Sequence, residues 1–201
     1  MNSTPKVSTI SLSAIVLAGG QSSRMGYDKA LIEILGVPLL RRVYDVALHS
    51  THQVYVVTGW NDRYRAILPS NCRLIADPQQ GPLVGFAQGL THIQTDWVLL
   101  LACDLPRLQS EDLQSWIIEL ETIAPDKIAL LPHSQKGWEP LCGFYRRTCL
   151  LNLQTFIDQG GRSFQSWLAY QSVQELRLEN RDVLFNCNTP KDLEEFNRAD
   201  L

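Results

Sequence analysis

Short apolar runs alternate with longer amphipathic stretches along most of the chain. The run "AIVL" at residues 14–17 is typical of a strand buried on both faces, because it offers no polar side to solvent. Similar runs predict strands at residues 14–17, 54–58, 73–76, 98–101, 128–131, 141–145, 173–178 and 183–185. Helical spacing of apolar positions predicts helices over residues 29–49, 81–93, 110–121, 146–159, 163–169 and 190–197.

The order of these elements predicts the fold class. Strands that alternate with helices through short connections favour an α/β fold, with a mainly parallel sheet and helices on both faces. Two helix starts have clear signals: Ser110 can cap a first turn that contains Glu111 and Asp112, and Pro190 follows Asn188 at the start of the last helix. Ligands of such sheets bind at the carboxyl ends of the strands.

Length and composition favour one domain. The 201 residues show no repeat or linker that would divide them, so we expect a loose tail over residues 1–11 and a single domain over residues 12–201. The composition, 45% hydrophobic and 19% charged, is ordinary for a globular protein. A net charge of −3 gives no basic surface for nucleic acid. No apolar run reaches membrane-spanning length, and no convincing signal-peptide cleavage site follows the first strand, so we expect a cytoplasmic protein without a membrane partner.

A glycine-rich loop with two cations follows the first strand. Gly19 and Gly20 allow backbone N–H groups to approach a phosphate, while Arg24 and Lys29 supply positive charge. The dinucleotide fingerprint does not fit the glycine spacing, and the P-loop does not fit either, because two residues separate Gly26 from Lys29. The loop therefore predicts a polyphosphate site of another kind, with a plain strand-to-helix turn as the alternative.

The segment "LAGGQSSRMGYDKA" resembles the signature L-A-G-G-x-S-x-R-M-G-x-D-K-A of the molybdenum cofactor guanylyltransferases, the MobA family. The resemblance implies a Rossmann-like nucleotidyltransferase that transfers GMP from Mg-GTP to the terminal phosphate of molybdopterin or Mo-molybdopterin and releases pyrophosphate. By the same resemblance, the nucleotide is held by Leu17, Ala18, Gly19 and Gly20, and its phosphates by Arg24 and Lys29. Other proteins of molybdenum cofactor biosynthesis and the recipient molybdoenzymes are the implied partners.

Two further motifs supply oxygen ligands for a metal. Asp104 follows a buried strand, where a carboxylate suits a hard cation such as Mg²⁺, although it can also cap the next turn. The segment "CDLP" matches the family's C-D-x-P motif, which implies that Asp104 is a Mg²⁺ ligand. Near the end of the chain, "NCNTPKDL" resembles the family's N-x-N-T-P-x-D-L motif, so Asn188 is a candidate second oxygen ligand and Asn186 a weaker one.

Further nucleotide contacts are expected after the third strand. The carboxylate of Asp77 can accept hydrogen bonds from the guanine edge, contact the ribose or shape the turn. The family has an Asp before a Gly-Pro-Leu sequence, which supports nucleotide contact by Asp77 and Gly81. An Asn after the second strand usually contacts nucleotide in the family; Asn61 is the nearest candidate, but the pattern around it departs from that of the family.

The second substrate leaves weaker signals. The segment "PLCGFY" resembles the family's P-L-x-x-L-Y strand, beside which Trp138 can stack on a pterin or simply pack. Lys136 and Arg162 are candidate phosphate ligands. A molybdopterin cytidylyltransferase that uses CTP is the nearest alternative, but it typically reads L-A-A-G where this chain has Leu17-Ala18-Gly19-Gly20. A GTP-binding regulatory protein without catalysis is the alternative of a different class.

Overall fold

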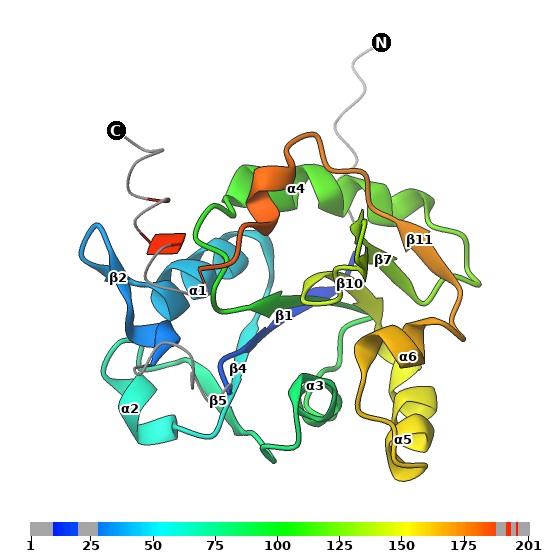
Figure 1. The fold of residues 1–201 in the computed structure, drawn as a ribbon, viewed down its shortest axis with the longest axis horizontal. Helices are drawn as coiled ribbons and strands as arrows, with labels where there is room; N and C mark the ends of the chain where they lie inside the picture. Colours follow the sequence, from blue (N-terminus) through cyan, green and yellow to red (C-terminus); the bar gives the residue numbers. More distant parts are fainter. Residues whose placement is uncertain (1–9, 20–27, 188–191, 194–195, 197–201) are drawn as a thin grey trace.

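The centre of the protein is a seven-stranded mixed sheet (Figure 1). The computed structural model describes residues 10–19, 28–187, 192–193 and 196, so most of the expected tail at residues 1–11 lies outside it. The strands of the sheet are β1 (Leu12–Leu17), β4 (Val54–Thr58), β5 (Arg73–Ala76), β6 (Trp97–Ala102), β7 (Ala129–Leu131), β10 (Cys142–Arg146) and β11 (Val173–Glu175). Their order is β11-β7-β10-β6-β1-β4-β5, and only β10 runs antiparallel to its neighbours. The mainly parallel sheet is confirmed.

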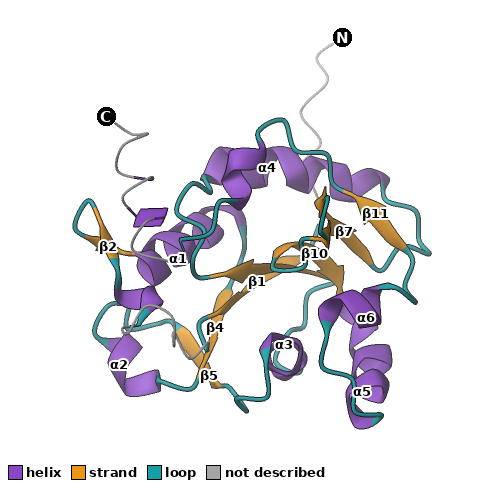
Figure 2. Ribbon diagram, viewed as in Figure 1, coloured by secondary structure: helices purple, strands orange, loops and turns teal. Residues whose placement is uncertain are grey.

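Helices cover both faces of the sheet, as expected (Figure 2). Helices α1 (Leu39–Ser50) and α4 (Ser110–Glu119) pack on one face, and α3 (Pro82–Leu90), α5 (Leu150–Asp158) and α6 (Phe164–Leu168) on the other. Alternate residues of β1 divide between the two faces: Ala14 and Val16 belong to the first core cluster, with α1 and α4, and Ile15 to the second, with α3, α5 and α6. None of the helices in the described part of the chain is long and apolar enough to cross a membrane.

The prediction of one long helix over residues 29–49 is wrong for residues 29–38. A 3₁₀ turn η1 (Lys29–Leu31) and a small hairpin, β2 (Glu33–Ile34) and β3 (Val37–Pro38), precede α1. The hairpin turns at Leu35 and Gly36 with φ of 52° and 75°, and Pro38 cannot donate a backbone hydrogen bond inside a helix. Apolar spacing continues through the hairpin because Ile32 and Ile34 form a third core cluster with residues of the C-terminal segment.

Other boundaries also differ from expectation. The prediction of a strand at residues 183–185 is wrong, because a 3₁₀ turn η4 (Arg181–Leu184) forms there. The Asn180 side chain caps this turn by accepting a hydrogen bond from Asp182 N at 2.9 Å. The cap of α4 lies one residue earlier than expected, since Asp112 accepts from Gln109 N at 2.9 Å. Short elements were missed: α2 (Asn61–Arg65) and the hairpin β8 (His133–Ser134) and β9 (Gly137–Trp138). The last helix expected, at residues 190–197, falls mostly outside the described residues.

The topology places a crevice beside β1. The chain passes from β1 to β4 and β5 on one side, then returns through α3 to β6 on the other side. Connections that leave a parallel sheet in opposite directions open a crevice at the carboxyl ends of the strands. The loops after β1, β4, β5 and β6 meet at that edge and carry the predicted site residues.

Candidate functional site

A cleft of about 630 Å³ opens at this edge of the sheet. Its volume is in the usual range for a small-molecule site. The structure brings together at the cleft these residues that the sequence predicted: Leu17, Ala18, Gly19, Lys29, Asp77, Gly81 and Asp104. Gly20, Arg24 and Asn188 lie outside the described residues, so their roles stay predictions. The convergence of segments from four loops follows from the parallel sheet, not from nearness in sequence.

Asp77 packs tightly against the end of β1. Its backbone N donates to Thr58 O at 2.9 Å, and its Oδ1 accepts from Gln79 N at 2.8 Å, so one carboxylate oxygen shapes the turn. A Cβ added to Gly19 would collide with the Asp77 carboxylate, and a Cβ at Gly85 would approach Oδ1 to 3.5 Å. The carboxylate therefore lies between two glycines at the wall of the cleft, where any side chain at residue 19 would displace it.

Gly81 is the N-cap residue of α3 and has a backbone conformation that suits glycine. Its φ is 96°, and Pro82 follows as the first residue of the helix. Both residues line the cleft. The N-terminal turn of α3 therefore faces the same space as the end of β1, which fits the expected nucleotide contact.

Asp104 and Lys29 face each other across the cleft. Asp104 lies two residues after the end of β6, and its Oδ2 is 4.0 Å from Lys29 Nζ, with side chains 16% and 21% exposed. Burial raises the pKa of the Asp104 carboxyl, and the neighbouring Lys29 ammonium opposes this shift. Within the described structure, Asp104 Oδ1 is buried and accepts no hydrogen bond.

The unsatisfied oxygen of Asp104 fits a metal ligand. A buried acceptor without a donor is uncommon in a stable fold unless a ligand completes it. A carboxylate oxygen is the donor that Mg²⁺ prefers. Helix α4 is capped through Gln109 and Asp112, so Asp104 is not the cap of that helix.

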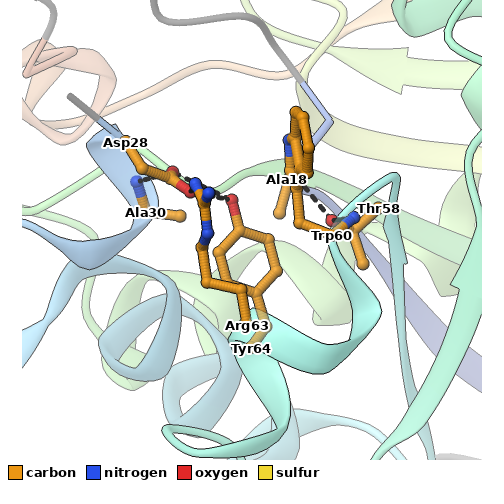
Figure 3. A network of polar contacts seen from close by, with 7 residues as sticks. All are labelled: Ala18, Asp28, Ala30, Thr58, Trp60, Arg63 and Tyr64. Atoms are coloured by element: carbon orange, nitrogen blue, oxygen red, sulfur yellow. Dashed lines mark hydrogen bonds and ion pairs between the residues drawn. The ribbon is translucent and has the colours of Figure 1, made fainter. Parts of the chain in front are cut away.

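A polar network that the sequence analysis missed holds the turn that carries Lys29 (Figure 3). Asp28 Oδ1 accepts from Ala30 N at 3.1 Å, and the two carboxylate oxygens accept from the Tyr64 hydroxyl at 2.9 and 2.8 Å. Arg63 Nη1 lies 3.0 Å from Oδ2. Burial, and then the hydrogen bond to Asp28, raise the pKa of the Tyr64 hydroxyl far above its usual value, so it remains a donor. Asp28 had a signal in the motif, next to Lys29; Tyr64 had none.

The C-terminal segment passes beside Asp104. Cys187 N donates to Asp104 O at 3.1 Å, and Asn186 lines the cleft with its Nδ2 bonded to Leu184 O at 2.8 Å. Arg107 fixes the segment by lying 4.5 Å above the Phe185 ring and by pairing with the Asp182 carboxylate at 3.5 Å. These contacts hold Asn186 and Cys187 beside Asp104, while the role of Asn188, which lies outside the described residues, stays a prediction.

Three residues that the sequence suggested as substrate contacts do not all line the cleft. Trp138 packs against the second core cluster, with His133 edge-on at 4.8 Å, and is not among the residues that line the cleft. Arg162 Nη1 donates to the carbonyls of its own loop, Ile157 O at 2.8 Å and Gly161 O at 2.7 Å. Asn61 begins α2 and does not line the cleft, although its Oδ1 is buried without a partner in the part described. The packing alternative is therefore favoured for Trp138.

Comparison with known proteins gives consistent matches along the chain. Residues 14–176 match the family model of the MobA-like NTP transferase domain. A protein of Nostoc sp. strain PCC 7120 named "Probable molybdenum cofactor guanylyltransferase" is 57% identical over 183 residues, which are 90% of this chain and 88% of that protein. A Vibrio cholerae protein named "Molybdenum cofactor guanylyltransferase" is 31% identical over 197 residues, 96% of this chain and 94% of its own.

A solved structure supports the fold. The molybdopterin-guanine dinucleotide biosynthesis protein A of Archaeoglobus fulgidus superposes with a TM-score of 0.78 and 24% identity. The match covers 94% of this chain and all of that one, 100%. The whole sheet and its helices therefore share the architecture of that protein.

Proposed function

The chain belongs to the MobA-like NTP transferase family, and from this premise we propose that it is a molybdenum cofactor guanylyltransferase. The enzyme transfers GMP from Mg-GTP to the phosphate of molybdopterin or Mo-molybdopterin. The observation that carries this proposal is the pair Asp104 and Lys29, a buried carboxylate with an unsatisfied oxygen 4.0 Å from an ammonium group, in a nucleotide-sized cleft. Such a pair suits a metal-nucleotide complex, which brings both a cation and negative phosphates.

The residues divide into three roles. The nucleotide is held by four residues at the end of β1 and just after it, Leu17, Ala18, Gly19 and Gly20. Asp77 and Gly81 contact the base or the ribose. Arg24 and Lys29 bind the phosphates. Asp104, with Asn188, would hold Mg²⁺, which would neutralise negative charge on the phosphates. Glycine rather than alanine at residue 19 agrees with GTP over CTP, since it admits Asp77 to the wall that faces the nucleotide.

The reaction needs alignment and charge more than a nucleophilic side chain. An oxygen of the molybdopterin phosphate forms a bond to the α-phosphorus of GTP, while the bond from that phosphorus to the bridging oxygen of pyrophosphate breaks. The attacking oxygen is already anionic near neutral pH, so no general base has to remove a proton. Lys29 and Arg24 stabilise the negative charge that gathers on the leaving pyrophosphate.

The same proposal implies a cellular compartment and partner proteins. The enzyme acts in the cytoplasm, with other proteins of molybdenum cofactor biosynthesis as neighbours and molybdoenzymes as recipients of its product. All five cysteines (Cys72, Cys103, Cys142, Cys149 and Cys187) are free thiols, which agrees with a reducing compartment.

The proposed function is tested by measuring pyrophosphate release from Mg-GTP and from Mg-CTP, each with and without a molybdopterin-bearing acceptor. We expect release that requires both GTP and the acceptor. A preference for CTP would assign the chain to the cytidylyltransferases while keeping the mechanism. Tight GTP binding without release in any combination would favour the regulatory alternative.

Gly19→Ala is expected to weaken Mg-GTP binding at least about tenfold, because the new Cβ has to displace the Asp77 carboxylate or the end of β1. Isothermal titration with Mg-GTP measures the dissociation constant. Gly36→Ala is the matched control: Gly36 has φ of 75° at the hairpin turn, so alanine is strained there, but no atom lies within 4 Å of its Cβ. Equal affinities of the Gly19→Ala variant and the wild type would contradict the close packing that we assign to Asp77.

A further inference from the structure

Lys29 stands on an element that is too short to be stable by itself. The turn η1 has three residues, and the cost of nucleating an isolated helical turn is not repaid over such a length. The Lys29 side chain is nevertheless held with its Nζ 4.0 Å from Asp104. Contacts from outside the turn must therefore fix its direction.

The Asp28 carboxylate provides one such contact. Its Oδ1 caps the turn by accepting from Ala30 N, and both of its oxygens accept from the buried Tyr64 hydroxyl (Figure 3). Tyr64 is 2% exposed, so its ring is fixed in the core. Hydrogen bonds to a charged acceptor are among the stronger ones in proteins. The exposed Arg63 adds an ion pair that solvent screens.

The chain just before Tyr64 also makes contacts with the end of β1, which is proposed to hold the nucleotide. The fully buried Thr58 hydroxyl donates to Ala18 O at 3.0 Å and accepts from Trp60 N at 3.0 Å (Figure 3). Residues 58–64, at the end of β4 and in α2, thus fix both Ala18 at the end of β1 and Asp28 beside Lys29. This one segment of the chain sets the separation between the end of β1, which lies along the nucleotide, and Lys29, which binds its phosphates.

We propose that Tyr64 and Asp28 are positioning residues for Lys29. The Tyr64 hydroxyl fixes Asp28, and Asp28 fixes the turn that directs Lys29 Nζ toward Asp104 and the bound phosphates. The identity of those phosphates rests on the proposed function. The decisive atom is the Tyr64 hydroxyl oxygen, because phenylalanine keeps the ring in the core and removes only the donor to Asp28.

A double-mutant cycle tests the proposal through Mg-GTP affinity. Tyr64→Phe is expected to raise the dissociation constant about fivefold to tenfold, and Lys29→Met by about tenfold or more. In the Lys29→Met background, adding Tyr64→Phe changes nothing further if Tyr64 acts through Lys29. Tyr64 also lines the cleft, so an equal loss in both backgrounds would show that it acts independently of Lys29, by direct nucleotide contact or by supporting the fold, and would overturn the proposal. Tyr55→Phe, which removes a hydroxyl hydrogen-bonded to the Gln53 side-chain amide at 3.0 Å outside the cleft, is the control and leaves the affinity unchanged.

A second measurement needs no nucleotide. The rate at which an activated ester acylates Lys29, followed by peptide mass spectrometry, is expected to rise several-fold in Tyr64→Phe, while the exposed Lys136 reacts at the wild-type rate. An unchanged Lys29 rate would overturn the positioning role. If the wild type did not bind Mg-GTP, the proposed function would fail, and the acylation rates would still decide the role of Tyr64.

Discussion

Asp104→Asn is expected to lower guanylyl transfer by about a thousandfold or more while the protein stays folded, because the amide cannot replace the anionic oxygen that holds the cation. Asparagine keeps the shape of the side chain and one acceptor, so the packing at the end of β6 is preserved. Turnover is measured as pyrophosphate release from Mg-GTP with the acceptor, and folding by circular dichroism. Asp158→Asn, which changes an exposed carboxylate on α5, is the control.

The stability of this variant gives an independent check. Burial raises the pKa of the Asp104 carboxyl, so the folded protein holds the proton more tightly than the unfolded chain. The raised pKa contributes stability that is present below the unfolded value and is lost as the pH rises through the folded value. In the absence of divalent cations, Asp104→Asn is therefore expected to melt at or above the wild-type temperature at neutral pH, and the difference shrinks on acidification. Substantial turnover in this variant would contradict the metal role of Asp104.

Most of the sheet followed from the sequence because parallel strands are buried on both faces. Such strands appear as unbroken apolar runs, and β4, buried at every position, has the boundaries that its run predicted. The edge strand β5 also has the predicted boundaries, although its Arg73 and Ala76 are exposed. The helix expected at residues 29–49 failed for a tertiary reason. Ile32 and Ile34 are apolar because they pack on Cys187 and Phe196, far along the chain, and this contact imitates helical spacing.

The site was predictable where its chemistry is local to a motif. Gly19, Lys29, Asp77 and Asp104 each follow a strand or open a turn, and a parallel sheet brings such positions to one edge. The contact between Asp28 and Tyr64 spans 36 residues, and a tyrosine in a helix does not indicate which distant carboxylate it will meet. Trp138 shows the opposite case, in which an aromatic residue near the expected second substrate serves the core.

Lys29→Met is expected to lower kcat by about 10²- to 10³-fold, since the charge that stabilises the leaving pyrophosphate is lost. Lys29→Arg is expected to recover only part of this loss, because a planar guanidinium does not reproduce a compact ammonium on a flexible stem. Both variants are compared by steady-state pyrophosphate release. Lys127→Met is the control for the loss of one positive charge: this half-buried lysine pairs with Asp126 at 3.6 Å and donates to Ser172 Oγ at 3.0 Å, and it does not line the cleft.

The stability of the Lys29 variants follows from the same pair. Because Lys29 opposes the raised pKa of Asp104, methionine leaves the buried carboxylate without its compensating charge and the protein is expected to unfold at a lower temperature at neutral pH. Adding Asp104→Asn removes that charge as well and restores the melting temperature, although it does not restore activity. Wild-type turnover in Lys29→Met, or a double variant that is less stable than Lys29→Met alone, would contradict the coupling between these two groups.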